Sequence, residues 1–144
     1  MKIKQLSVFL ENKPGHLSAI CARLADAKIN ILTLSLADTQ QFGILRLIVE
    51  QWEQAMKLLQ EAGFVVRLTE VVATEINDEP GGLASILRVL ETAGLNVEYM
   101  YAFTFHAKDK AILVFRFDDP DTAVGVLQRN GINVFDDVEL YRLG

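Results

Sequence analysis

Hydrophobic and polar residues alternate along Lys2–Leu10, which predicts a β-strand with one buried face. Hydrophobic residues then recur at every third or fourth position of Leu17–Ala27, as on an α-helix that buries one side. Two further strand patterns follow at 29–38 and 42–50, and then comes a shorter amphipathic helix. The same succession begins again near Glu70. The pattern therefore predicts the order strand, helix, strand, strand, helix, strand, twice over.

The second half of the chain repeats the first half. Pro14-Gly15 recurs as Pro80-Gly81, and Asn30 recurs at the same spacing as Asn96. Matches further along each half are shifted by two residues, which places an insertion in the polar stretch 106–110. Such an insertion is typical of a hairpin loop.

The order of elements predicts an α+β fold. Each half is expected to form a ferredoxin-like βαββαβ unit, with an antiparallel four-stranded sheet and two helices on one face. We expect one unit over residues 1–69 and a second over residues 70–144. The stretch 64–76 reads as nearly continuous strand without a flexible linker, so the units are expected to pack together. Each Pro-Gly turn should open a helix, with the proline in the first helical turn.

Charge and composition narrow the classes of function. The 144 residues carry a formal net charge of −5, which disfavours nucleic acid and anionic membrane surfaces as partners. No stretch has the length of a membrane span or the form of a signal peptide. The single cysteine, Cys21, fits a reducing compartment, so we expect a cytoplasmic protein.

The sequence lacks the patterns of a catalytic site. It has no recognisable nucleophile–base pair, paired carboxylates or phosphate-binding loop. The two histidines, His16 and His106, lie in different predicted elements without the spacing of metal ligands. Cys21 falls on the hydrophobic side of the first helix and is interpreted as a core residue. We expect no catalytic residues, no metal and no cofactor, and hence a protein that is not an enzyme.

The repeated Pro-Gly turn is the candidate for a binding site. A turn of this kind between a strand and a helix is usually structural. A helix N-terminus also exposes unpaired backbone N–H groups and a partial positive charge, so Gly15, His16 and Leu17 can receive a carboxylate. Asn12 lies two residues before the proline, and Asn30 begins the next predicted strand. An asparagine amide offers an acceptor for an ammonium as well as a donor for a carboxylate. These groups together suit an α-amino acid.

These features resemble the ACT domain, the small-molecule sensing module of amino-acid metabolism. The resemblance rests on [Asn/Asp]-x-Pro-Gly-x-Leu after the first strand, on the hydrophobic helix, and on an asparagine at the same distance beyond the motif in both halves. It covers the whole chain as two ACT units. It implies a non-catalytic regulatory module in which a free amino acid binds between units paired side by side. A homodimer and an unknown protein partner in amino-acid metabolism are implied as well.

The resemblance places the ligand between the turn of one unit and the beginning of the second strand of its neighbour, within one chain or between two. The implied ligand-binding residues are Asn12, Gly15, His16 and Leu17 with Asn96, and Asp78, Gly81, Gly82 and Leu83 with Asn30. We favour the Asn12 site, because an ionised Asp78 would repel a ligand carboxylate. Tyr99 is a candidate wall of the pocket, although its alternation with Tyr101 also fits ordinary strand packing. The alternative function is a structural or oligomerisation module with no ligand.

Overall fold

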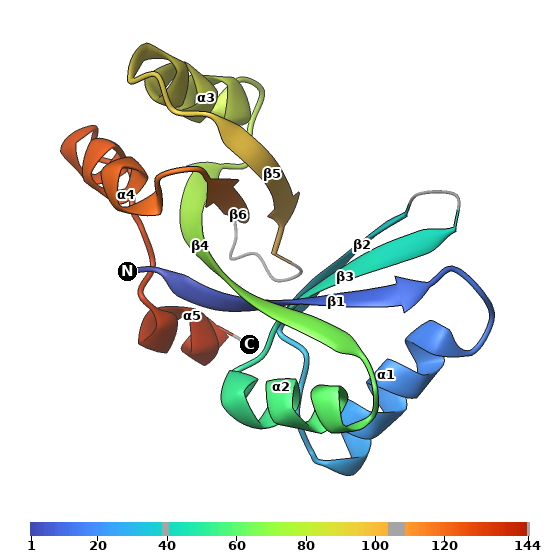
Figure 1. Cartoon of the computed structure of the whole chain (residues 1–144). Helices are drawn as coiled ribbons and strands as arrows, with labels where there is room; N and C mark the ends of the chain where they lie inside the picture. The colour runs from blue at the N-terminus through green and yellow to red at the C-terminus, as the bar shows by residue number, and fades with distance from the viewer. Residues whose placement is uncertain (39–40, 104–108, 144) are drawn as a thin grey trace. The chain divides into compact units, whose positions relative to one another are not determined.

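The computed structural model describes residues 1–38, 41–103 and 109–143. By its contacts the chain divides into two compact units, whose elements are labelled in Figure 1. We call Lys4–Thr69 the first unit, and we call Glu70–Gly144 together with Met1–Ile3 the second unit.

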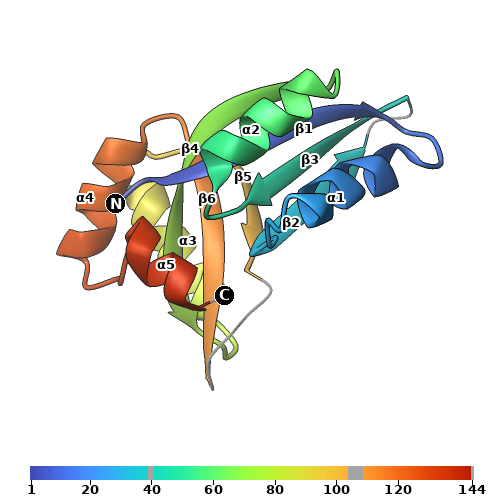
Figure 2. The same ribbon diagram turned by 90° about the horizontal axis from the view of Figure 1, so that it is seen from below.

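The first unit is a sheet covered by two helices. Its elements are β1 (Ile3–Glu11), α1 (His16–Asp26), β2 (Thr33–Asp38), β3 (Phe42–Ile48), α2 (Trp52–Glu61) and the beginning of β4 (Val65–Asn77). The strands follow the order β2-β3-β1-β4, and β1 and β2 are both antiparallel to β3. Helices α1 and α2 lie on one face of this sheet (Figure 2). The predicted βαββαβ order is confirmed.

The alternation of the sequence explains the core of the first unit. Every second residue of β1 faces the helices, and the same holds for β3, so these side chains exclude water together with one stripe from each helix. The fully or almost fully buried members are Leu6, Val8, Leu10, Ile20, Leu24, Leu45, Leu47, Ala55 and Leu59. Burial of each large aliphatic side chain stabilises the unit by about 1.5–3 kcal/mol.

The second unit repeats this plan. Its elements are the end of β4, then α3 (Gly82–Thr92), β5 (Val97–Ala102), β6 (Lys110–Phe117), α4 (Pro120–Arg129) and α5 (Asp137–Leu143). Strand β6 pairs antiparallel with both β4 and β5, in the order β4-β6-β5. Its core consists of Val72, Ile86, Leu90, Leu113, Phe115, Phe117, Ala123, Leu127 and Val134. The predicted antiparallel α+β architecture is therefore confirmed for both halves.

The prediction of a last strand in the second half is wrong. Only a single bridge forms there, between Thr74 and Val134, and the chain then turns into α5. The helix is favoured by a capping box: Asp136 Oδ1 accepts a hydrogen bond from Glu139 N at 2.8 Å, and Glu139 Oε1 accepts one from Asp136 N at 3.4 Å. These reciprocal bonds satisfy two backbone N–H groups at the helix start. In a strand, the same groups would need partners on a neighbouring strand.

Two predicted boundaries also need correction. Pro14 and Pro80 are not in the first helical turn, because Gly15 and Gly81 follow them as N-caps in the left-handed conformation, with φ of 92° and 87°. The second strand of the first unit begins only at Thr33 rather than at residue 29. Most of the predicted insertion at 106–110, with His106, lies outside the described residues.

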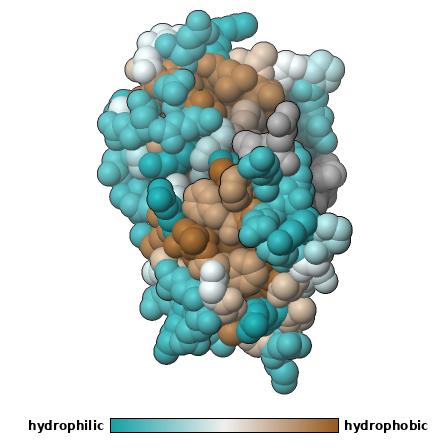
Figure 3. Space-filling model, turned by 45° about the vertical axis from the view of Figure 1, so that its right-hand side comes forward, coloured by the Kyte–Doolittle hydropathy of each residue, from teal (hydrophilic) through white to brown (hydrophobic). Residues whose placement is uncertain are grey.

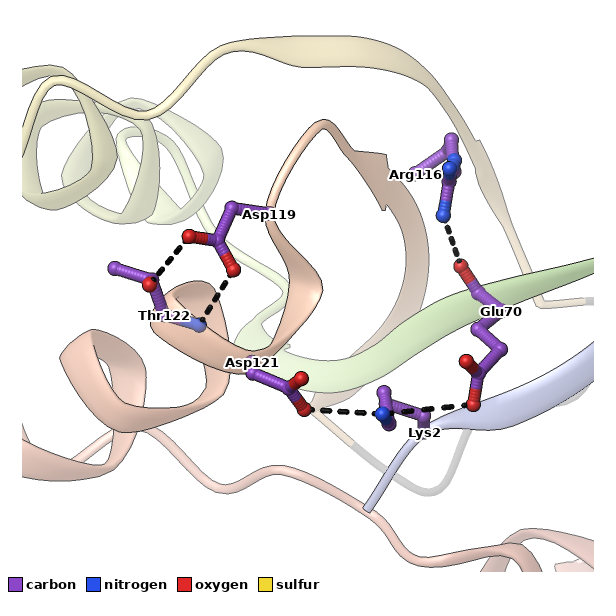
Figure 4. A network of polar contacts seen from close by, with 6 residues as sticks. All are labelled: Lys2, Glu70, Arg116, Asp119, Asp121 and Thr122. Atoms are coloured by element: carbon purple, nitrogen blue, oxygen red, sulfur yellow. Dashed lines mark hydrogen bonds and ion pairs between the residues drawn. The ribbon is translucent and has the colours of Figure 1, made fainter.

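The first residues of the chain are held by charges of the second unit. Lys2 Nζ lies 3.1 Å from Asp121 Oδ1 and 3.7 Å from Glu70 Oε2 (Figure 4). Hydrogen bonding and charge from Asp121, followed by the charge of Glu70, raise the pKa of Lys2. The carbonyl oxygen of Glu70 also accepts a hydrogen bond from Arg116 Nη1 at 2.8 Å. Met1–Ile3 is thereby tied to elements far away in the sequence.

We predict that the cap of α4 gives the protein acid-dependent stability. Asp119 is the N-cap, and its carboxylate accepts hydrogen bonds from Thr122 N at 3.2 Å and Thr122 Oγ1 at 2.6 Å. These bonds, led by the side-chain bond, lower the pKa of Asp119. The charge-dependent part of this stabilisation is complete above the unfolded-state pKa and is lost as the pH falls through the lowered folded-state pKa. Urea unfolding should therefore show Asp119→Ala less stable than the native protein at pH 7, by a difference that shrinks toward the acid limit, where the protonated carboxyl keeps only a neutral cap.

Asp119→Asn is the matched control, because an asparagine oxygen still caps the helix but does not titrate. Its stability relative to Asp119→Ala should stay constant with pH. A difference between native protein and Asp119→Ala that persists unchanged at the acid limit would contradict the assignment.

Candidate ligand-binding site

The turn after the first strand ends in a left-handed glycine in both units. Gly15 and Gly81 adopt the left-handed conformation that a side chain disfavours, and their carbonyl oxygens accept the first helical hydrogen bonds, from Ala19 N at 2.9 Å and Ser85 N at 3.0 Å. The first N–H group of each helix donates back into the turn, from His16 to Lys13 O at 3.4 Å and from Gly82 to Glu79 O at 3.0 Å. The N–H groups of the next residues have no intrahelical partner, as at any helix start. Such a helix start attracts anionic groups.

A hollow of about 790 Å³ adjoins the turn of the first unit. Three predicted residues meet there, since Asn12, Gly15 and Leu17 all line it. Asn12 Nδ2 donates a weak hydrogen bond to Asp38 Oδ2, at 3.5 Å. Asp38 comes to this place because β1 and β2 lie on either side of β3, run in the same direction and end at Gly43, which pairs with both Leu10 and Asp38. Sequence reasoning missed Asp38, because it did not give the order of the strands within the sheet.

Charged groups at this hollow are already paired. Lys13 Nζ lies 2.9 Å from Glu11 Oε2, and both residues line the hollow. The hydrogen bond and the charge of Lys13, with a smaller contribution from the charge of His16, lower the pKa of Glu11. A zwitterion would meet both signs of charge together with the amide of Asn12.

His16 does not line this hollow, although it adjoins the lining residues in sequence. Its ring is half-buried, and Nδ1 has no hydrogen-bond partner among the residues that the structure describes. The structure thus separates His16 from the group formed by Asn12, Gly15 and Leu17.

The second turn lines a different kind of hollow, of about 450 Å³. Gly81 and Gly82 contribute to it, whereas Asp78 and Leu83 do not. The backbone N of Asp78 donates to Asp109 O at 2.7 Å, and the side chain of Leu83 is 37% exposed. The hollow extends instead toward the residues that follow α4, which sequence reasoning did not consider.

The asparagines beyond the helices occupy unequal positions. Asn96 directly precedes β5 and lines a hollow of about 460 Å³ beside α3. Asn30 is exposed in the segment between α1 and β2, before the strand begins. Tyr99 is half-buried on β5 opposite Arg116, and it does not line the hollow that contains Asn96.

Within 1–38, 41–103 and 109–143, no group of three or more His, Cys, Asp and Glu side chains is arranged to hold a metal ion. Among the same residues, no helix has the length and apolar character needed to cross a bilayer.

We predict that the second turn tolerates no side chain at Gly82. A Cβ on Gly82 would overlap the carbonyl oxygen of Asn77, which belongs to the backbone and cannot turn aside. Gly82→Ala should lower the free energy of unfolding by about 1–3 kcal/mol, measured by urea denaturation.

Gly125→Ala in α4 is the matched control, because a Cβ there meets only the flexible end of Arg129 at 3.4 Å. It should stabilise the protein by about 0.5–1 kcal/mol through helix propensity. Equal effects of the two substitutions would contradict the close approach at Gly82.

Comparison with known structures finds a similar protein over nearly the whole chain. Protein BT0572 from Bacteroides thetaiotaomicron is 38% identical, with a TM-score of 0.92, and the match covers 99% of this chain and 98% of that one. No curated protein matches the chain in sequence.

More distant structures share the fold alone. The ligand-free regulatory subunit of aspartate kinase from Thermus thermophilus has a TM-score of 0.64 at 13% identity, over 88% of this chain and 91% of that one. The corresponding subunit from Thermus flavus has a TM-score of 0.62 at 13% identity, over 88% and 90%.

The family model described as an ACT domain pair matches residues 1–143. The strand–helix–strand–strand–helix order that both units share, and their paired glycine turns, agree with that match. The chain belongs to the family of ACT domain pairs.

Proposed function

We propose that this ACT domain pair is a non-catalytic regulatory module that binds a free amino acid between ACT units and signals to a partner enzyme or regulator. The observation that carries the proposal is the hollow beside the first turn, where Asn12, the start of α1 and a Lys13–Glu11 pair come together. An amino acid needs an anion-binding group and an ammonium acceptor at short range, and this hollow supplies both. The single cysteine supports a cytoplasmic setting.

The second half of the proposed site is Asn96, at the start of an edge strand. Among the described strands, β2 ends the order in the first unit and β5 ends it in the second. If β5 of a second copy paired antiparallel with β2, its beginning would lie at the end of β2, where Asn12 and Asp38 are. We therefore propose a homodimer in which Asn12 and Asn96 come from different copies.

Exposed hydrophobic side chains support this pairing. Hydrophobic residues reach the surface of the molecule among polar ones (Figure 3). On β2, Leu34 is 42% exposed and Leu36 is 48% exposed, and on α3 both Leu83 and Leu87 are more than a third exposed. An edge strand with open backbone groups and apolar neighbours is a template for another strand. The regulatory role is supported by the shared fold of the aspartate kinase subunits, which are themselves named as regulatory.

A thermal-shift panel of the twenty amino acids tests the ligand. At least one should raise the unfolding midpoint, by roughly 5–10 °C at about a hundred times its Kd, because it binds only the folded protein. Asn12→Ala and Asn96→Ala should each abolish the shift, and Asp78→Ala should matter less. Gln54→Ala, an exposed amide on α2, is the control and should leave the shift unchanged.

No shift with any amino acid at millimolar concentration would leave the alternative, a structural or oligomerisation module without a ligand. Loss of the shift with Asp78→Ala alone would show that the ligand sits at the second turn instead.

The pairing has its own test. Leu34→Lys puts a charge on the exposed edge strand and should convert the dimer to a monomer, measured by light scattering after size exclusion. The same variant should lose the amino-acid shift. Val138→Lys on α5, where the native side chain is 54% exposed, is the control and should remain dimeric. A native protein that is monomeric at every concentration would contradict the pairing.

A further inference from the structure

The hollow beside the second turn can be compared with the equivalent place in the first unit. The backbones match there: Phe64 N donates to Leu59 O at 3.1 Å, and Ile132 N donates to Leu127 O at 3.0 Å. Residues around the hollow can therefore be paired one by one across the duplication.

Three lining positions carry smaller side chains than their partners in the first unit. Gly82, Val89 and Ile132 stand where the first unit has His16, Arg23 and Phe64. Phe64 packs against the core of the first unit, and His16 is half-buried. The second unit thus has space, about 450 Å³, at a place where the first unit has side chains.

Three other lining positions have gained hydrogen-bond acceptors. Glu79, Ser85 and Asn130 stand where the first unit has Lys13, Ala19 and Ala62. Asn130 Nδ2 donates to Val126 O at 2.8 Å, which leaves its Oδ1 as an acceptor. The Ser85 hydroxyl donates to Gly81 O at 2.9 Å, and the lone pairs of the hydroxyl oxygen can still accept a hydrogen bond.

The difference in charge between the two units also favours a ligand with a positive charge. Lys13 of the first unit is paired with a carboxylate, whereas the Glu79 carboxylate forms no ion pair among the described residues. Lys110 also lines the hollow, and its ammonium donates to Asn77 Oδ1. Glu75 lines the hollow as well, so the lining carries two carboxylates and one ammonium, a net charge of −1 that favours a cation.

The floor of the hollow is apolar. Ile86 is 2% exposed, and Val89 and Ile132 are half-buried beside it. Acceptors at the rim and a hydrocarbon floor match a ligand with a hydrogen-bond donor of positive charge at one end and an aliphatic chain at the other. The volume lies in the usual range of small-molecule sites.

We propose that the second unit binds an aliphatic primary ammonium in this hollow, by itself, with Glu79, Ser85 and Asn130 around the charged group and Ile132 against the chain. This site shares no residue with the proposed amino-acid site at Asn12, and it does not depend on that proposal.

The probe is butylammonium chloride, titrated into the full chain while backbone amide signals are followed by NMR. The amides of Gly81, Gly82 and Gly131 should shift and saturate, whereas sodium butyrate and 1-butanol should leave them in place. L-norvaline is added as a separate arm. Saturation of the same amides by norvaline also supports the proposal and identifies amino acids as the source of the ammonium.

Variants exchange residues between the two units. Glu79→Lys should weaken butylammonium binding about tenfold or more, because it replaces a charge-assisted acceptor with a like charge. Ile132→Phe should weaken it by filling the space. Glu61→Lys, the same charge change at an exposed position of the first unit, is the control and should change the affinity less than about twofold.

The absence of saturable shifts at these amides overturns the proposal, as does an equal response to butyrate. Equal losses in Glu79→Lys and Glu61→Lys also overturn it, because they would show only nonspecific attraction. Loss of butylammonium binding in Asn12→Ala would assign the ligand to the other site. If butylammonium still binds but no amino acid gives a thermal shift that depends on Asn12, the proposed function is refuted and the ammonium site stands.

Discussion

A left-handed glycine at the end of the first strand sets the geometry of each unit. The chain must leave the sheet and return across one face as a helix, and Gly15 and Gly81 make this reversal in a conformation that other residues seldom adopt. The position of the helix then determines which side chains reach the core and which backbone N–H groups face outward. The candidate sites at both turns follow from the same reversal.

The duplication has kept the cores and changed the turns. Leu24 and Leu90 occupy equivalent places and are both about 1% exposed. The residue is the same in both units because a change of side-chain volume in a close-packed core is destabilising. The exposed residues around the two turns are less constrained, and there Lys13 of the first unit corresponds to Glu79 of the second. Two copies of one scaffold therefore present different chemistry at the same backbone feature.

The sequence predicted the fold well, because periodicity reports which face of an element is buried. The alternation in β1 and the stripe on α1 correspond directly to the observed core. The failures were local. Hydrogen bonds between Asp136 and Glu139 override the strand tendency of the neighbouring residues, and a periodicity argument does not see them. The signal was nevertheless present as an acidic residue three positions before a glutamate.

Of the candidate site, the sequence could identify the turn but not the groups gathered around it. Asp38 joins Asn12 only through strand direction, and Asn130 joins Gly82 only through the path of the chain after α4. Such meetings depend on tertiary structure, and they are visible in a sequence only once the strand order is known. His16 shows the converse, since it adjoins the turn in sequence but does not line the hollow.

The anchoring of Lys2 has a consequence for the order of events during synthesis. Its partners Glu70 and Asp121 are translated long after Lys2 itself, and Asp121 lies near the end of the chain. The first unit can fold on the ribosome as soon as β4 has emerged, while the leading residues still lack their place. Lys2 therefore gains its ion pairs only after the second unit has formed, although β1, which begins at the next residue, already belongs to the folded first unit.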